Sequence, residues 1–421
     1  MKVIHVSTQI SGGAGRSALR LHQGLLRLGV DSQMLVLRPP TEAGVTEFKF
    51  SSGLASRVRR FFRRQLHRRR GEAIRQAPQP RFEEFSLDTS VSVGRDLVTQ
   101  LPPDAIINLH WVAGFVNYTE FFPFVGRRKV FWTLHDMNPF TGGCHFDNGC
   151  GRFVENCGHC PQLGSNAPHD LSRDIWQRKN LALRNLEIGQ LEVVTPSQWL
   201  AAEARRSSLF KGCPTSVIPY GIDTDAFAPV DRMAARAELG LPLDAKIVLF
   251  VAAAVDSPRK GAKDLLEAIR SVKADGLFLA SVGASSPPET PGVGGKHFGV
   301  VKQDEMLAKI YSAADIFLIP SLADNLPNTV MEAMACGTPV VGYGAGGIVD
   351  LVAQGKTGLW VAPGNTAELA KAIQHLLADT ALRAHCAAQC RQTVLAHHTL
   401  ELQAAAYRRL YAENTSPFPP G

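Results

Sequence analysis

The sequence has no long hydrophobic run. Across 421 residues there is no uninterrupted stretch of about 18 apolar residues, so a membrane-spanning helix is not expected. The first residues, Met1 to Val6, are typical of a β-strand and not of a signal peptide. Apolar residues make up 45% of the chain and charged residues 20%, which excludes a disordered protein. We therefore expect a soluble, cytoplasmic protein with room for two hydrophobic cores.

A dinucleotide-binding fingerprint is also missing. Residues 12–15, Gly-Gly-Ala-Gly, follow the first apolar strand. They lack the G-x-G-x-x-G spacing and the acidic residue about 20 positions later that the fingerprint requires. Glycines let a backbone approach a phosphate or a sugar closely, but an ordinary strand-to-helix turn contains them too. No pair of carboxylates arranged as in a glycosidase can be recognised either.

Acidic residues are absent between Arg57 and Arg70, where eight arginines supply most of the formal net charge of +7. Phe61, Phe62 and Leu66 interrupt these arginines. The pattern is typical of a basic amphipathic segment that lies on an anionic membrane surface. A solvated helix face is the alternative. No nucleic-acid-binding module accompanies the segment, so nucleic acid is not an expected partner.

Short apolar runs alternate with helical stretches along the whole chain, and the pattern restarts after Pro219. This alternation predicts parallel sheets covered by helices. The economical solution is an α/β fold with two doubly wound, Rossmann-like domains facing across a cleft. The expected ranges are 1–214 for the first domain, 40–95 for a basic insertion without clear elements, 140–165 for a cysteine-rich loop, 215–398 for the second domain, 399–415 for a C-terminal helix, and 416–421 for a disordered tail.

The most informative segment runs from Pro320 to Val341. Asp324 and Glu332 stand eight residues apart, the first in a turn and the second on the helix that follows. Exposed N–H groups at a helix start favour phosphate. Carboxylates accept hydrogen bonds from sugar hydroxyls. Diphosphate at the helix start, with ribose and sugar on the two acids, describes a nucleotide-sugar site.

This block resembles the paired-acid motif of retaining GT-B glycosyltransferases of glycosyltransferase family 4, closest to enzymes of bacterial surface polysaccharide biosynthesis. Asp324 stands where the family usually has Glu. Other segments are similar to family landmarks in the expected order: 7–15, 133–136, 195–200, 218–227, 259–261 and 346–350. The resemblance implies transfer of a sugar, with retention, from a UDP- or GDP-sugar donor to a glycan or lipid-linked saccharide. It implies no cofactor or metal for the chemistry. It also implies that the helix over 399–415 crosses back to the first domain.

The resemblance also implies roles for individual residues. The expected catalytic residues are His135, Lys260, Asp324 and Glu332. The expected donor-binding residues are Gly12, Gly13, Arg259, Lys260, Asn325, Leu326, Pro327, Asn328, Thr329 and Glu332. His110 and Asp136 are expected on the acceptor side. The family commonly has a Gly-Arg pair shortly before the lysine, whereas residues 252–255 are Ala-Ala-Ala-Val. Arg259 would take the place of that arginine.

Four of the eight cysteines lie within 17 residues: Cys144, Cys150, Cys157 and Cys160. In a cytosolic chain such clustering indicates a metal site before disulfides. Zinc prefers four tetrahedral thiolate or imidazole ligands, and C-x2-C supplies two of them. We therefore expect a structural zinc site that shapes the loop after His135. An iron–sulfur cluster and reduced free thiols are the alternatives.

Two other functions share this architecture. A nucleotide-sugar epimerase would isomerise the donor rather than transfer its sugar. A non-catalytic binding or assembly module derived from the same fold would bind the donor without turnover. The set of landmarks favours the transferase over both.

Overall fold

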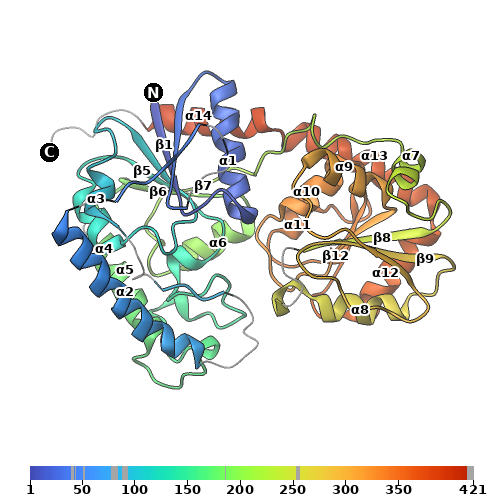
Figure 1. The fold of residues 1–421 in the computed structure, drawn as a ribbon, viewed down its shortest axis with the longest axis horizontal. Helices are drawn as coiled ribbons and strands as arrows, with labels where there is room; N and C mark the ends of the chain where they lie inside the picture. Colours follow the sequence, from blue (N-terminus) through green and yellow to red (C-terminus); the bar gives the residue numbers. More distant parts are fainter. Residues whose placement is uncertain are drawn as a thin grey trace. The chain divides into compact units, whose positions relative to one another are not determined.

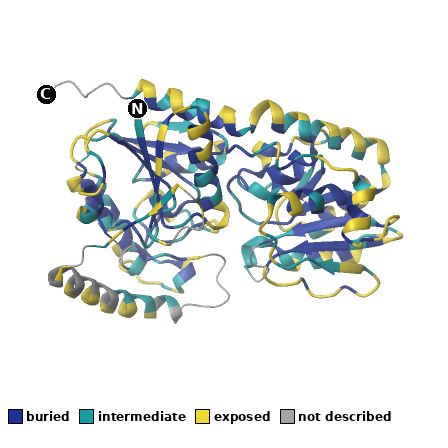
Figure 2. Ribbon diagram, turned by 45° about the horizontal axis from the view of Figure 1, so that its top comes forward, coloured by how far each residue is buried: buried dark blue, intermediate teal, exposed yellow. Residues whose placement is uncertain are grey.

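The computed structural model describes residues 1–38, 42, 44–50, 53–76, 84–87, 93–184, 186–252 and 257–414, with side chains given for only part of 53–76. These residues form two compact domains. The first comprises Met1–Ile218 and the segment that begins at Gln403, and the second comprises Pro219–Leu402. Figure 1 shows a central sheet with helices around it in each. In Figure 2 the strands are mostly buried, whereas the outer sides of the helices are exposed.

The first domain contains a seven-stranded parallel sheet in the order β3-β2-β1-β4-β5-β6-β7. Its elements are β1 (Lys2–Ser7), α1 (Gly12–Arg27), β2 (Asp31–Val36), β3 (Val45–Glu47), α2 (Leu54–Arg75), α3 (Arg95–Val98), β4 (Ile106–Leu109), α4 (Tyr118–Phe121), η1 (Phe122–Phe124), β5 (Val130–Thr133), η2 (Asn138–Phe140), η3 (Arg152–Val154), η4 (Pro161–Leu163), α5 (Leu171–Leu183), β6 (Leu191–Thr195), α6 (Gln198–Arg206), β7 (Thr215–Val217) and most of α14 (Leu400–Glu413). The chain first adds strands on one side of β1 and then returns to add β4 on the other. A ligand site is expected outside the carboxyl ends of β1 and β4, where this reversal occurs.

The second domain contains a six-stranded parallel sheet in the order β10-β9-β8-β11-β12-β13. Its elements are α7 (Arg232–Glu238), β8 (Lys246–Val251), η5 (Pro258–Lys260), α8 (Ala262–Ser271), β9 (Leu277–Val282), β10 (Gly294–His297), α9 (Asp304–Ala313), β11 (Ile316–Ile319), α10 (Asn328–Ala335), β12 (Val340–Tyr343), α11 (Ile348–Leu351), β13 (Gly358–Val361), α12 (Thr366–Ala378) and α13 (Thr380–His397). Here the reversal lies between β8 and β11. The prediction of two parallel-sheet, Rossmann-like α/β domains is confirmed.

Buried apolar strands explain this fold. Every residue of β4, β5, β6 and β11 is buried, as expected for parallel strands covered on both faces. In the first domain, Tyr407 and Tyr411 of α14 are buried in the same cluster as Phe131 of β5. Tyr407 bonds Thr133 and Tyr411 accepts from Asn108, so α14 is fastened to this sheet by hydrogen bonds as well as by apolar contact.

Several boundaries differ from the expected ones. The first domain ends at Ile218 and not at residue 214, because β7 pairs with β6. The interpretation of 40–95 as a stretch without elements was wrong, since it contains β3 and the 22-residue helix α2. The expected tail, 416–421, lies outside the described residues. No helix among the described residues combines the length and apolar character that crossing a membrane requires.

Candidate functional site

The strand reversal in the second domain brings a lysine, an arginine and an aspartate together. Arg259 and Lys260 lie in η5 after β8, and Asp324 follows the neighbouring strand β11. Lys260 Nζ donates to Asp324 Oδ2 at 2.6 Å, and Arg259 Nη1 lies 3.5 Å from the same oxygen. Arg259 also donates to the carbonyl of Ala323 at 2.7 Å. Two cations thus converge on one carboxylate at the position where Rossmann-like folds bind ligands.

Glycines allow the loops after these strands to come this close. Gly261 has φ +70°, and a Cβ there would lie 1.9 Å from the carbonyl oxygen of Pro320. Gly346 has φ +60°, and a Cβ there would lie 1.9 Å from the carbonyl oxygen of Asp324. Any larger residue would push the loops apart. The glycines of segments 259–261 and 346–350 therefore hold the turn that carries Asp324.

Burial and opposite charge act against each other in this cluster. Burial would raise the pKa of Asp324, but the charges of Lys260 and Arg259 outweigh it and lower that pKa. Burial lowers the pKa of Lys260 and of Arg259, and Asp324 opposes both shifts. The cluster has two positive charges against one negative charge when all three groups are ionised. It can therefore attract an anion such as a diphosphate.

Helix α10 begins next to this cluster. Asn325 and Leu326 are buried, Pro327 precedes the helix, and Asn328 and Thr329 are its first residues. The N-terminus of an α-helix favours phosphate because its N–H groups and its dipole point outward. The predicted donor-binding residues 325–329 therefore form one continuous stretch from the Asp324 turn into α10.

Glu332 lies one turn into α10 and is only 3% exposed. Its Oε2 accepts a hydrogen bond from Tyr311 Oη of α9 at 3.1 Å. This contact holds the carboxylate in one orientation. Tyr311 was not predicted as a site residue, because the sequence of an amphipathic helix does not indicate that its tyrosine will bond a glutamate 21 residues later.

In the first domain the predicted histidines lie at the carboxyl ends of neighbouring strands. His110 follows β4, and His135 lies two residues after the end of β5. His110 Nδ1 is 3.1 Å from His135 Nε2. His110 Nε2 is 2.9 Å from Nδ1 of His5, a residue of β1 that the sequence interpretation missed. His110 is 2% exposed, so this structure places it behind His135 rather than on an open surface.

Asp136, the other residue expected on the acceptor side, is buried in a network of its own. Its Oδ2 lies 2.7 Å from His145 Nδ1 and accepts from Trp111 Nε1 at 3.1 Å, and its Oδ1 accepts from the Asn138 N–H at 2.8 Å. Burial opposes protonation of His145, but the negative charge of Asp136 outweighs it and raises the pKa of His145. Asp136 therefore anchors the loop that follows His135.

Gly12 and Gly13 are the first two residues of α1, directly beyond the carboxyl end of β1. A strand-to-helix turn was one interpretation of residues 12–15, whereas the helix already begins at Gly12. The glycines thus lie at the strand reversal of the first domain.

The four clustered cysteines line one small cavity of about 20 Å³. Cys157 and His159 hold φ values of 54° and 46°, left-handed conformations that persist only where the surrounding structure enforces them. Over the described part of the chain, however, no three histidine, cysteine or acidic side chains are placed so that they could hold a metal ion. The zinc site stays a prediction, and it requires the thiols to turn towards a shared centre.

Metal analysis tests that prediction. Chain purified from zinc-supplemented cells is expected to carry about one zinc ion, because four thiolates form one closed structural site. Cys157→Ser is expected to lose most of the metal, whereas Cys213→Ser, outside the cluster, should keep it. Metal-free wild-type chain that unfolds at the same temperature with and without added zinc would contradict the prediction.

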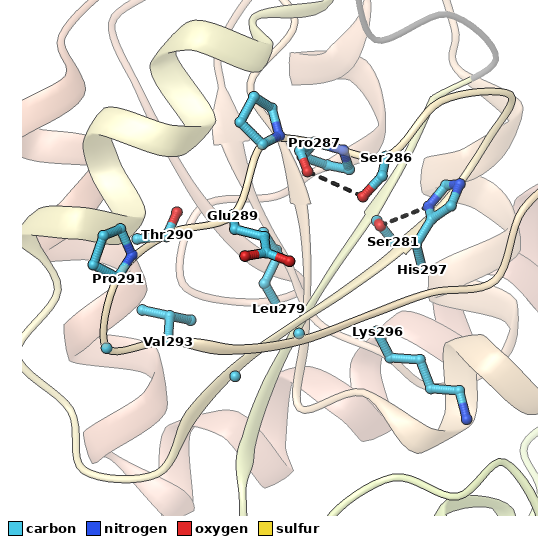
Figure 3. Close-up of a pocket in the computed structure, with 14 residues that line it drawn as sticks. Leu279, Ser281, Ser286, Pro287, Glu289, Thr290, Pro291, Val293, Lys296 and His297 are labelled. Atoms are coloured by element: carbon cyan, nitrogen blue, oxygen red, sulfur yellow. Dashed lines mark hydrogen bonds between the residues drawn. The ribbon is translucent and has the colours of Figure 1, made fainter.

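A further cavity, of about 610 Å³, lies where β9 and β10 approach the loop between them. Figure 3 shows Glu289 and Thr290 on the loop that connects the two strands, and Ser281 of β9 beside His297 of β10. Ser281 Oγ lies 2.9 Å from His297 Nδ1. The sequence interpretation did not predict this cavity, because the proline- and glycine-rich segment gives no sign of how the loop closes.

The chain is similar to known glycosyltransferases along most of its length. Among curated proteins, the D-inositol 3-phosphate glycosyltransferase of Mycobacterium tuberculosis is 30% identical over 249 residues, which is 54% of this chain and 52% of the relative. The chain therefore matches about half the length of that relative. Residues 245–379 match the model of glycosyl transferases group 1.

Solved GT-B structures share the fold. Sucrose-phosphate synthase from Thermosynechococcus elongatus superposes with a TM-score of 0.66 at 22% identity, over 98% of this chain and 99% of that chain. Anabaena HepE in complex with UDP gives 0.64 at 16% identity, over 98% and 100%. Residues 11–226, just over half of the sequence, match the model of Glycosyltransferase Family 4. The chain belongs to that family of glycosyltransferases.

Proposed function

We propose that this protein transfers a sugar, with retention, from a nucleotide-sugar donor to a hydroxyl group of a glycan or lipid-linked saccharide. The observation that carries the proposal is the cluster of Arg259, Lys260 and Asp324 beside the start of α10. It combines an anion site with carboxylates that can accept from hydroxyl groups. The proposed acceptors belong to bacterial polysaccharide biosynthesis, and the proposed transferred sugar is a hexose.

Each group in the second domain has a proposed role. Lys260, Arg259 and the first N–H groups of α10 stabilise the negative charge that grows on the diphosphate as the glycosidic bond breaks. Glu332 accepts hydrogen bonds from the ribose hydroxyls. Asp324 keeps Lys260 in position and accepts from a hydroxyl of the donor sugar. The departing phosphate oxygen takes the proton of the acceptor hydroxyl, and the new bond forms on the same face of the sugar. No protein base is needed for that step.

UDP and GDP are the proposed nucleotides, and the fold neighbour solved with UDP supports the first of them. We expect Glu332→Gln to weaken UDP binding about tenfold, because a charged hydrogen-bond acceptor to the ribose becomes neutral. Isothermal titration calorimetry without metal measures this for both nucleotides. Glu368→Gln, on the exposed side of α12, is the matched control and should bind like wild type.

Two results would count against this proposal. Nucleotide binding that is indifferent to Glu332→Gln would mean that the site lies elsewhere. Binding of UDP or GDP without sugar transfer to any acceptor would favour the non-catalytic module, and isomerised donor without transfer would favour the epimerase.

We also propose that α2 binds an anionic membrane surface, where a lipid-linked acceptor would be found. The region predicted to be amphipathic is helical over Leu54–Arg75. Phe61 and Phe62 are 58% and 66% exposed, and Val58, one turn earlier, is exposed beside them. Exposed aromatic side chains next to exposed arginines such as Arg68 are the combination that anionic lipid surfaces bind.

Vesicle sedimentation tests this role of α2. The double variant Phe61→Ser, Phe62→Ser is expected to reduce binding to phosphatidylserine-containing vesicles about tenfold or more, since two aromatic side chains proposed to insert into the membrane are lost. Phe124→Ser, at an exposed site outside α2, should bind as wild type does. Equal binding by both variants, or binding that ignores salt, would contradict the proposal.

A further inference from the structure

Three histidines of the first domain, His5, His110 and His135, form a continuous row of ring contacts across neighbouring strands, which we call the histidine relay. His5 lies in β1, His110 follows β4 and His135 follows β5, and these three strands are adjacent in the sheet. Nδ1 of His5 is 2.9 Å from Nε2 of His110, and Nδ1 of His110 is 3.1 Å from Nε2 of His135. His5 is fully buried and His110 almost so. The contacts therefore run from the core to His135, one of the expected catalytic residues.

All three rings are neutral near pH 7. Burial lowers the pKa of His5 to about 3, and burial likewise lowers that of His135 to about 4 against the opposing charge of Asp136. Burial, together with His5 and His135, lowers the pKa of His110 as well. A neutral imidazole has one N–H donor and one acceptor nitrogen. Each contact must pair one donor with one acceptor, so the three rings can carry their hydrogens either all on Nδ1 or all on Nε2.

The buried end of the histidine relay, at His5, decides between these two arrangements of hydrogens. Within the described structure, Nε2 of His5 is buried and has no hydrogen-bond partner. If the hydrogens were on Nε2, this end would be an orphaned N–H in the core. If they were on Nδ1, it would be an unused acceptor. Folded proteins tolerate an unused acceptor more readily than an orphaned N–H. The arrangement with every hydrogen on Nδ1 is therefore the stable one.

We propose that His5 and His110 are positioning residues that hold His135 as the tautomer with its hydrogen on Nδ1, so that His135 donates a hydrogen bond to a hydroxyl oxygen of a bound sugar substrate. This inference rests on the proposed function, sugar transfer, for which His135 is an expected catalytic residue. The family motif identifies His135, but the arrangement of its hydrogens follows from His5 and His110 of this chain.

The histidine relay also excludes His135 as the base that takes the proton of the acceptor hydroxyl. Its Nε2 lone pair accepts from His110, and its other nitrogen carries a hydrogen. A ring in this state has no lone pair left to take the proton of an acceptor hydroxyl. The proton must therefore leave on another group, which agrees with its proposed transfer to the departing phosphate oxygen.

Nitrogen NMR of the full chain labelled with ¹⁵N in the histidine rings tests the tautomer directly. The His135 signals are assigned by their loss in His135→Gln. In wild type at pH 7.5, Nδ1 of His135 is expected to be the protonated nitrogen and Nε2 the unprotonated one. A wild-type His135 that carries its hydrogen on Nε2 would overturn the proposal, whatever the variants do.

Two variants test the roles of the positioning residues. His110→Leu removes the donor to His135 Nε2, so the Nε2–H tautomer should become populated and turnover should fall about fivefold, the scale of one lost neutral hydrogen bond. His5→Asp places an acceptor opposite His110 and should reverse the hydrogens along the whole relay. His22→Leu is the matched control, since His22 lies beside His5 but bonds Ser32 instead. A His135 tautomer unchanged in His110→Leu would overturn the role of His110.

The NMR result does not depend on activity. Absence of nucleotide binding and sugar transfer together with the expected tautomer would reject the proposed function and leave the relay standing. Sugar transfer by a wild-type enzyme with the opposite tautomer would reject the relay and leave the function standing.

Discussion

Replacing Lys260 with methionine is expected to lower the rate of sugar transfer by about 10²- to 10³-fold, the scale of one lost donor to a developing oxyanion. The Lys260 ammonium lies 2.6 Å from Asp324 and beside the start of α10, where the diphosphate is proposed to bind. Methionine keeps the length of the side chain and removes its charge. The diphosphate charge grows as the bond breaks, so the loss should fall mainly on kcat and less on the KM for the donor.

Steady-state kinetics with the donor identified by calorimetry measure this effect. Lys309→Met is the matched control, because Lys309 also pairs with an acid of the second domain, Glu238, but on an exposed surface. It should retain the wild-type rate. Asp324→Asn should slow transfer less than Lys260→Met does, since it leaves the cation in place. A Lys260→Met enzyme within threefold of wild type would show that Lys260 does not act on the leaving group.

The strands of this fold were predictable because they are buried on both faces. Runs such as Val130–Thr133 and Ile316–Ile319 contain apolar residues without alternation, which distinguishes them from half-buried strands. The short strand β7 was not found, because Thr215–Val217 is only partly buried and carries little apolar signal. The range of α2 was not predicted, although a helix face was one interpretation of its arginines. Its arginines suggested a surface segment, whereas its fold depends on helix propensity that periodicity alone does not reveal.

The sequence predicted individual residues of the candidate site but not the contacts between them. Sequence motifs indicated Lys260 and Asp324 separately. Their ion pair joins residues 64 positions apart and depends on β8 and β11 being neighbours, which only the strand order provides. His5 gave no signal at all, since a single histidine in an apolar strand is usually a core residue. The proposed role of His5 depends on its contact with His110 and on the contact of His110 with His135, which only the structure shows.

Lowering the pH from 6.5 towards 4 is expected to destabilise the first domain steeply. Histidines in an unfolded chain have a pKa of about 6.5. Burial holds the pKa of His5 at about 3 and lowers those of His110 and His135. In this window the unfolded chain binds protons that the folded chain does not. The free energy of unfolding therefore falls by about 1.4 kcal/mol per pH unit for each buried neutral histidine, and by less for His135, which is partly exposed.

The His145–Asp136 pair does not cancel this trend. Because its pKa is raised in the folded state, His145 stabilises the fold below its unfolded pKa, and this contribution is lost only as pH rises through the folded value. Asp136 has a lowered pKa. Its contribution is present above the unfolded carboxylate value and is lost only as pH falls through the folded value, below the window considered. Acid sensitivity between pH 6.5 and 4 therefore reports the buried neutral histidines of the first domain, including His22, whose pKa burial also lowers.

Urea unfolding of the full chain at several pH values measures this sensitivity. Four of the five tryptophans lie in the first domain, so their fluorescence reports its unfolding. His5→Leu should reduce the slope against pH by about 1.4 kcal/mol per unit, because one buried imidazole no longer differs between the two states. His385→Leu, in the second domain, should leave the slope unchanged. A wild-type slope near zero would mean that the relay is protonated in the folded protein, and the assignment of His135 as a neutral donor would then fail with it.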